Sequence, residues 1–346
     1  MSRGFFPLDA QLQLYEQRWS EQVAKQAVWL YGRVEDGVAE EVMQTIGGID
    51  ISDTSIWRRQ ERWGERIKAN EELRRATASA LPSRGQVVPG EAQRSCDMSV
   101  AMDGAMIHVR GEGWKELTVG CVSEIEVRPE WVAETEEEEE RAHAVNNSYV
   151  AVLGRPEAFG QAVWAEAVRC GVPQARDSIV IGDGANWIWN LAAEHFGSSR
   201  QVVDWYHAKE HLYRAGHLAF GEGSNEAIGW AKGMETPLYQ GQAWKVAQAI
   251  NELAEEFPGV AKELQSEAGY FENNKRRMQY LELREEGFPI GSGMVESGCK
   301  QFRARFTGAG MRWSREGAER LIPVRAAIMS RRFDEVWRAA YKLPLK

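Results

Sequence analysis

The sequence predicts a mixed α/β protein in which a βββαβαβ core follows a helical N-terminal region and carries a helical insertion. Three observations lead to this prediction. Residues 1–90 have helical patterns, and residues 97–152 hold three β-rich runs. Two short apolar runs, each followed by a helical pattern, then come before residue 211. Residues 211–284 are rich in helix formers and have almost no β-like alternation.

Within the N-terminal region, residues 38–67 show a short amphipathic helix, a break at Gly47 and Gly48, and a second helix with Ser52 or Asp53 as its N-cap. This is the helix-turn-helix pattern of DNA-binding proteins, although a plain helical hairpin would give a similar pattern. Its spacing places Ile56, Trp63 and Ile67 on one face. The DNA-facing candidates on the other side are Arg58, Arg59, Gln60 and Arg62, of which the first three are candidates for base edges.

The core begins with "DMSVAMDGAMIHV", "KELTVGCVSEIEV" and "NSYVAVLG", which predict three successive antiparallel strands. The acidic run at 134–141, between the second and third strands, is expected to be an exposed loop. Residues 156–172 predict a helix that starts at Pro156 and ends at Gly171. Two parallel strands follow, which end at Asp183 and near Asp204, and each leads into a helix.

Three acidic residues stand where this topology would bring them together. The tripeptide Asp-Gly-Ala occurs at Asp103 and at Asp183, on the first and fourth strands, which are expected to be neighbours. Glu296 lies near the start of a helix that Ser292 can cap. A lone aspartate at a strand end is usually a turn or a cap, but three converging carboxylates can hold two Mg²⁺ ions, for which Mn²⁺ should substitute.

The spacing Asp204-x-x-His207 marks the end of the fifth strand, and His211 lies one helical turn further on. A metal cluster of these three residues is one interpretation. The favoured alternative is a supporting role, in which Asp204 and His207 hydrogen-bond each other or a backbone group and fix the strand end.

The net charge of −9 is unevenly distributed. From residue 296 to the end there are twelve Lys and Arg against five Asp and Glu, a local balance of +7 on an otherwise acidic chain. The residues expected to contact phosphates are Lys300, Arg303, Arg305, Arg312 and Arg315. The alternative is a solvated amphipathic helix. No apolar run approaches the roughly 18–20 residues that span a bilayer, and we expect a cytoplasmic, nucleoid-associated protein.

These residues resemble the DDE transposases of the bacterial insertion-sequence group known as the ISKra type, which are related to Mutator-like enzymes and have a ribonuclease H-like βββαβαβα core. The resemblance covers residues 30–340. The motifs that carry it are "AMDGAMIHVR", "VIGDGANWIWN", Asp204-x-x-His207, "GSGMVESGCKQF" and "RFTGAGMRWSREGAERLIPVRA". It maps the catalytic, metal-binding acids onto Asp103, Asp183 and Glu296. Relatives often carry a cysteine-bearing segment before the helix-turn-helix, whereas the first cysteine here is Cys96.

The resemblance implies metal-dependent cleavage of double-stranded DNA at terminal inverted repeats, and joining of the freed 3′ hydroxyl to target DNA by a homodimer. The expected divisions are a helix-turn-helix region at 1–92, a catalytic core at 93–210, a helical insertion at 211–284, and a closing helix with a basic tail at 285–346. Two other functions stay open: a sequence-specific DNA-binding protein derived from a decayed transposase, and a cellular two-metal nuclease on the same core.

Overall fold

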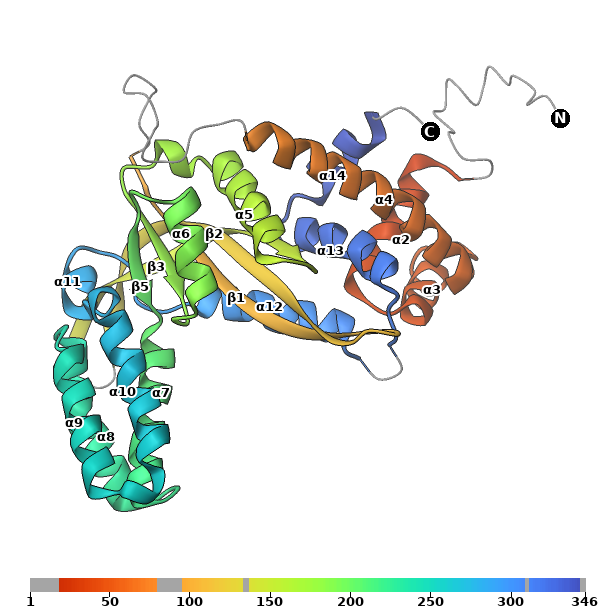
Figure 1. Ribbon diagram of the computed structural model, residues 1–346. Helices are drawn as coiled ribbons and strands as arrows, with labels where there is room; N and C mark the ends of the chain where they lie inside the picture. Colours follow the sequence, from red (N-terminus) through yellow and green to blue (C-terminus); the bar gives the residue numbers. More distant parts are fainter. Residues whose placement is uncertain (1–18, 80–94, 133–136, 309–310, 343–346) are drawn as a thin grey trace, which may run out of the picture.

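One five-stranded mixed sheet forms the centre of the molecule, with the strand order β3-β2-β1-β4-β5 (Figure 1). The structure, a computed structural model, describes residues 19–79, 95–132, 137–308 and 311–342. β1, β2 and β3 form an antiparallel meander, and β4 and β5 extend it in parallel with β1. The predicted order of strands and helices is therefore confirmed. The strands are β1 (Asp97–Val109), β2 (Gly113–Val132), β3 (Glu137–Val152), β4 (Ser178–Gly182) and β5 (Arg200–Val203).

The acidic run departs from the prediction. Residues 134–136 lie outside the described residues, but Glu137 to Arg141 belong to β3 and pair with residues 128–132 of β2. The side chains of Glu137 and Glu138 point into water, where solvent and salt screen their repulsion. The hydrogen-bond ladder of the long β2–β3 hairpin therefore continues through this charged segment.

Helices cover both faces of the sheet, and two adjacent residues of β2 show which helix lies on which face. A Cβ on Gly120 would lie 3.0 Å from Val163 of α5 (Pro156–Cys170), whereas Val119 approaches Gly298 of α12 (Gly293–Phe306). Since successive side chains of a strand point to opposite faces, α5 and α12 lie on opposite sides of the sheet. α5 starts at Pro156 and ends at Gly171 in the left-handed conformation, as predicted.

The N-terminal helices pack against the C-terminal ones. Ile56, Trp63 and Ile67 of α4 are buried, as predicted, but Gln60 is also buried, with 1% of its surface exposed, because it lies on the same inward face. The Trp63 and Trp337 rings lie 4.3 Å apart, between α4 and α14. The predicted domain boundary at residue 92 lies outside the described residues. The helices involved are α2 (Glu21–Arg33), α3 (Asp36–Thr45), α4 (Asp53–Ala78), α13 (Arg315–Met329) and α14 (Phe333–Lys342).

Between β5 and α12, the structure is helical, as predicted for the insertion. Figure 1 shows α7 to α10 as a group of long helices that extends away from the sheet. α7 begins immediately after β5, so its first turns lie at the sheet edge that carries the acidic residues. The helices that follow β4 and β5 are α6 (Asn186–His195), α7 (Trp205–Phe220), α8 (Asn225–Tyr239), α9 (Ala243–Glu256), α10 (Ala261–Asn274) and α11 (Tyr280–Glu285). None of the helices within the described ranges is long and apolar enough to cross a lipid bilayer.

Candidate active site

The sheet register brings Asp103 and Asp183 side by side. β1 and β4 run parallel with Ala101 opposite Ile181, so both partners stand two residues before an Asp-Gly-Ala tripeptide. The offset of this pairing equals the spacing of the two tripeptides along the chain. The two aspartates therefore extend the register of neighbouring parallel strands, and their charges influence each other.

The carboxylate of Asp103 accepts a hydrogen bond from the Gly104 N–H at 2.6 Å. The thiol of buried Cys299, on α12, is a second donor group close enough to influence the same carboxylate. Burial raises the pKa of Asp103; these two donors lower it, and the negative charge of Asp183 raises it again. Cys299 was not predicted as a site residue, although it lies three positions after Glu296 and so on nearly the same helix face.

Asp183 receives one hydrogen bond from its own loop and one from a helix of the insertion. Its carboxylate accepts from the Ala185 N–H at 2.8 Å, and its backbone carbonyl accepts from the Tyr270 hydroxyl at 2.9 Å. The Tyr270 ring, on α10, packs so closely on Gly184 that a Cβ there would lie 2.7 Å from it. Gly184 has a φ of +104°, which favours glycine for a second reason. Burial, followed by the charges of Asp183 and Asp204, raises the pKa of Tyr270.

Asp204, at the end of β5, accepts hydrogen bonds from two backbone groups. It is buried, and one carboxylate oxygen accepts from the His207 backbone N–H at 2.7 Å, which caps α7. The other accepts from the backbone N–H of Ser292, the N-cap residue of α12. His207 lies close enough to Asp103 for a positive charge on its ring to lower the pKa of that carboxylate.

His211 does not join Asp204 in a metal cluster. Its Nδ1 lies 2.6 Å from a carboxylate oxygen of Glu267, and its ring stacks on Tyr270 with centroids 3.7 Å apart. Because Tyr270 also donates to the Asp183 carbonyl, the stacked pair links the insertion helices to the loop after β4. Sequence reasoning missed Tyr270 and Glu267 because nothing in their local pattern relates them to a strand end 80 or more residues away.

Glu296 lies in the first turn of α12, three positions before Cys299. Its side chain is 41% exposed, and its nearest partners are Lys300 Nζ at 3.7 Å and Ser292 Oγ at 3.5 Å. Exposed pairs of this length contribute little stability, so the carboxylate can change rotamer at small cost. Burial and the Asp103 carboxylate raise the pKa of Cys299, and the charge of Glu296 adds to this effect.

The donor set fits a divalent cation. Asp103 and Asp183 present carboxylate oxygens from adjacent strands, and oxygen ligands are what Mg²⁺ takes. Their mutual repulsion, seen in the pKa of Asp103, would be relieved by a cation between them. Among the described residues no three His, Cys, Asp or Glu side chains converge as a metal-holding group. Glu296 completes such a set only if its side chain turns from Lys300 toward Asp103.

The predicted DNA contacts divide into accessible and internal residues. Lys300, Arg303 and Arg312 are exposed, whereas Arg315 is half-buried and pairs with Glu112. Arg305 is only 3% exposed, so it cannot reach a phosphate on the surface. It donates to the Tyr31 carbonyl at 2.9 Å, and its guanidinium lies 4.8 Å and 5.0 Å from the ring centroids of Tyr31 and Trp313. The apolar spacing of α12 turns Arg305 inward.

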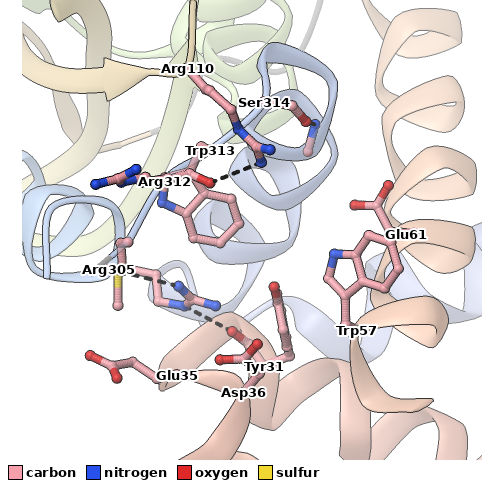
Figure 2. Close-up of a pocket in the computed structure, with 12 residues that line it drawn as sticks. Tyr31, Glu35, Asp36, Trp57, Glu61, Arg110, Arg305, Arg312, Trp313 and Ser314 are labelled. Carbon is pink, nitrogen blue, oxygen red and sulfur yellow. Dashed lines mark hydrogen bonds between the residues drawn. The ribbon is translucent and has the colours of Figure 1, made fainter. Parts of the chain in front are cut away.

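Arg305 lines a pocket of about 390 Å³. Figure 2 shows Trp57 and Glu61 of α4 on another side of this pocket. Of the predicted base-reading residues on that helix, Arg58 is exposed, and Arg59 lies over the Trp19 ring at 4.5 Å. Arg62 is exposed as well. The burial of Gln60 excludes it from a base edge in this conformation.

No model of a known protein family matches the chain, and no curated protein resembles it at a significant level. Function is therefore inferred from the geometry of the acidic site and from its surroundings.

Proposed function

We propose that the chain is a DDE transposase with a ribonuclease H-like core, which cleaves double-stranded DNA at transposon ends and joins the freed 3′ hydroxyl to target DNA. The observation that carries the proposal is the equivalent placement of Asp103 and Asp183, each two residues beyond the Ala101–Ile181 pair of the adjacent parallel strands β1 and β4. The strand order β3-β2-β1-β4-β5 and the helical segment before α12 support it, because both are expected of that core.

In this proposal Asp103, Asp183 and Glu296 hold Mg²⁺. When bound, a pair of such ions activates the attacking oxygen and stabilises the leaving oxygen in a phosphoryl transfer. The Gly104 N–H fixes the Asp103 carboxylate, and the Tyr270 hydroxyl fixes the backbone at Asp183.

Exposed cations on α12 flank the third acid. Lys300 and Arg303 follow Glu296 by one and two helical turns, so a phosphate contacting them lies beside the acidic site. Arg312, which follows α12, offers a further exposed guanidinium.

The test is cleavage of a duplex that carries the DNA bordering the gene, in Mg²⁺ or Mn²⁺. Asp103→Asn, Asp183→Asn and Glu296→Gln should each reduce cleavage by about 100-fold or more, because even residues behind metal ligands matter by about 10–100-fold. Asp50→Asn and Glu222→Gln make the same chemical changes at exposed positions and should leave the rate unchanged. Cleavage that survives the first three substitutions would contradict the proposal.

A DNA-binding protein with a decayed site is the second candidate, favoured by one observation: Glu296 faces Lys300 and Ser292 rather than the two aspartates. Specific binding in a gel-shift assay, without cleavage in either metal, would support this candidate. Cleavage without joining of 3′ ends to a target plasmid would instead indicate a nuclease.

A further inference from the structure

A second pocket, of about 820 Å³, lies beyond the other end of the strands that carry the acidic site. Met98 lines it, five positions before Asp103 on β1, which corresponds to about 17 Å along a strand. Its charged lining is four arginines against a single acid, Glu124. We call it the arginine pocket, after Arg33, Arg169, Arg331 and Arg332.

Two of these arginines share one buried carboxylate. Glu166 lies behind the pocket and pairs with Arg332 at 3.0 Å, with Arg169 at 2.7 Å and with Arg74 at 3.1 Å. One carboxylate therefore serves three guanidinium groups, although Arg74 also pairs with Glu71. Nε and Nη1 of Arg332 are buried without a hydrogen-bond partner, and Nη1 lies 3.7 Å from a carboxylate oxygen of exposed Glu335. Unused donors on a buried cation leave capacity for an anion.

Among the described residues, no acid pairs with the other two arginines. Arg33 and Arg331 are both exposed. Arg33 lies over the Trp29 ring at 4.5 Å. The nearby Arg325 reflects the same excess: burial, followed by the positive charges of Arg33 and Arg305, lowers its pKa to about 10.

The backbone supports a role for the Arg331 side chain. Asn146 and Arg331 are the two non-glycine residues of the described chain with positive φ, at 53° and 56°, and both line this pocket. Arg331 occupies the turn after α13, where glycine is usual because a Cβ is unfavourable in the left-handed conformation. Residues held in this conformation cluster at functional sites. A guanidinium kept at such a position points to a contact that glycine could not make.

We propose that the arginine pocket binds a phosphate group, and that this is a backbone phosphate of double-stranded DNA. The phosphate chemistry follows from the guanidinium donors alone, whereas DNA as its source rests on the proposed function. A pocket of this volume is the size of a small-ligand site, so it admits one phosphate with its sugar while the duplex lies across Arg33 and Arg331.

The test uses the full chain in EDTA, so that binding is measured without catalysis. Fluorescence anisotropy with a random duplex at several salt concentrations gives the affinity and its salt slope. Arg331→Gly should weaken binding about tenfold and reduce the slope by about 0.9, the effect of one lost phosphate contact. Its thermal midpoint should not fall, because glycine suits the backbone there. Arg331→Lys should retain most of the affinity. Arg338→Gln, an equal loss of charge at an exposed position of α14, should leave the slope unchanged.

The proposed phosphate site would be refuted if Arg331→Gly changed neither the affinity for DNA, nor its salt slope, nor the binding of pyrophosphate measured by calorimetry. If Arg331→Gly weakened the binding of pyrophosphate but not of DNA, the bound phosphate would not come from DNA. The pocket would then bind a free phosphate compound. Neither readout depends on Asp103. Failure of the cleavage reaction and failure of this pocket are therefore distinguishable.

Discussion

Replacing Glu166 with glutamine should lower the free energy of unfolding by about 3 kcal/mol at pH 7. Glu166 on α5 is 2% exposed and holds together α4, β3 and the turn before α14 through Arg74, Ser148 and Arg332. Burial by itself raises the pKa of this carboxylate, but the neighbouring guanidinium groups outweigh burial and lower the pKa from 4.5 to about 2. At about 1.4 kcal/mol for each pKa unit, this difference corresponds to about 3 kcal/mol.

The pH dependence follows from the direction of that change. A carboxylate whose pKa is lower in the folded state stabilises fully above its unfolded pKa and loses the effect as pH falls through its folded pKa. The stability difference between wild type and Glu166→Gln should therefore decrease from about 3 kcal/mol at pH 7 to about 2 kcal/mol at pH 3.5, and vanish below about pH 2.

Urea denaturation followed by tryptophan fluorescence, at pH 7 and pH 3.5, measures both quantities. Glu222→Gln provides the matched control, since Glu222 is exposed in the turn between α7 and α8. A difference below about 0.5 kcal/mol at pH 7, the range of ordinary surface substitutions, would refute the assignment of Glu166 as an electrostatic link. So would a difference of unchanged size at the two pH values.

Three further outcomes are expected. Tyr270→Phe removes the hydroxyl that holds the Asp183 carbonyl and should slow metal-dependent cleavage about tenfold at an unchanged thermal midpoint; an unchanged rate would exclude a positioning role. Gly298→Ala puts a Cβ 2.7 Å from the Tyr149 ring and should lower the free energy of unfolding, measured in urea, by about 1–3 kcal/mol. Gly293→Ala, whose Cβ meets open space, should change it little, and equal losses in the two variants would contradict the packing of α12 on Tyr149. Arg303→Gln should weaken binding to terminal and random duplexes alike in fluorescence anisotropy and reduce the salt slope by about 0.9; a loss confined to terminal DNA would indicate base reading instead.

The order of strands and helices was predictable because each element carries its own local signal. Pro156 and Gly171 mark the two ends of α5, and the short apolar run that forms β4 is buried throughout. The acidic segment that includes Glu137 was predicted wrongly, because repulsion between side chains is local whereas the ladder that β3 forms with β2 is not. Local charge therefore did not determine the backbone conformation.

The site residues that could be found from the sequence are those whose position follows from a local motif and from the order of the strands. Asp103 and Asp183 share a tripeptide and a strand register, so their proximity follows from the topology. Tyr270 reaches Asp183 from a helix of the insertion, and such a contact depends on how the insertion folds back, which no local pattern encodes. Arg305 was assigned to the surface by its charge alone, yet its position on the apolar face of α12 turns it inward.

The helix that carries the third acid is positioned by the side chain of Asp204. Both carboxylate oxygens of Asp204 accept backbone N–H groups, one from His207 at the start of α7 and one from Ser292 just before α12. The second bond ties the start of α12 to the end of β5, the strand beside β4. Glu296 follows four residues after Ser292, so its distance from Asp183 is set through Asp204. The sheet register thus places two acids, and one buried carboxylate orients the helix that carries the third.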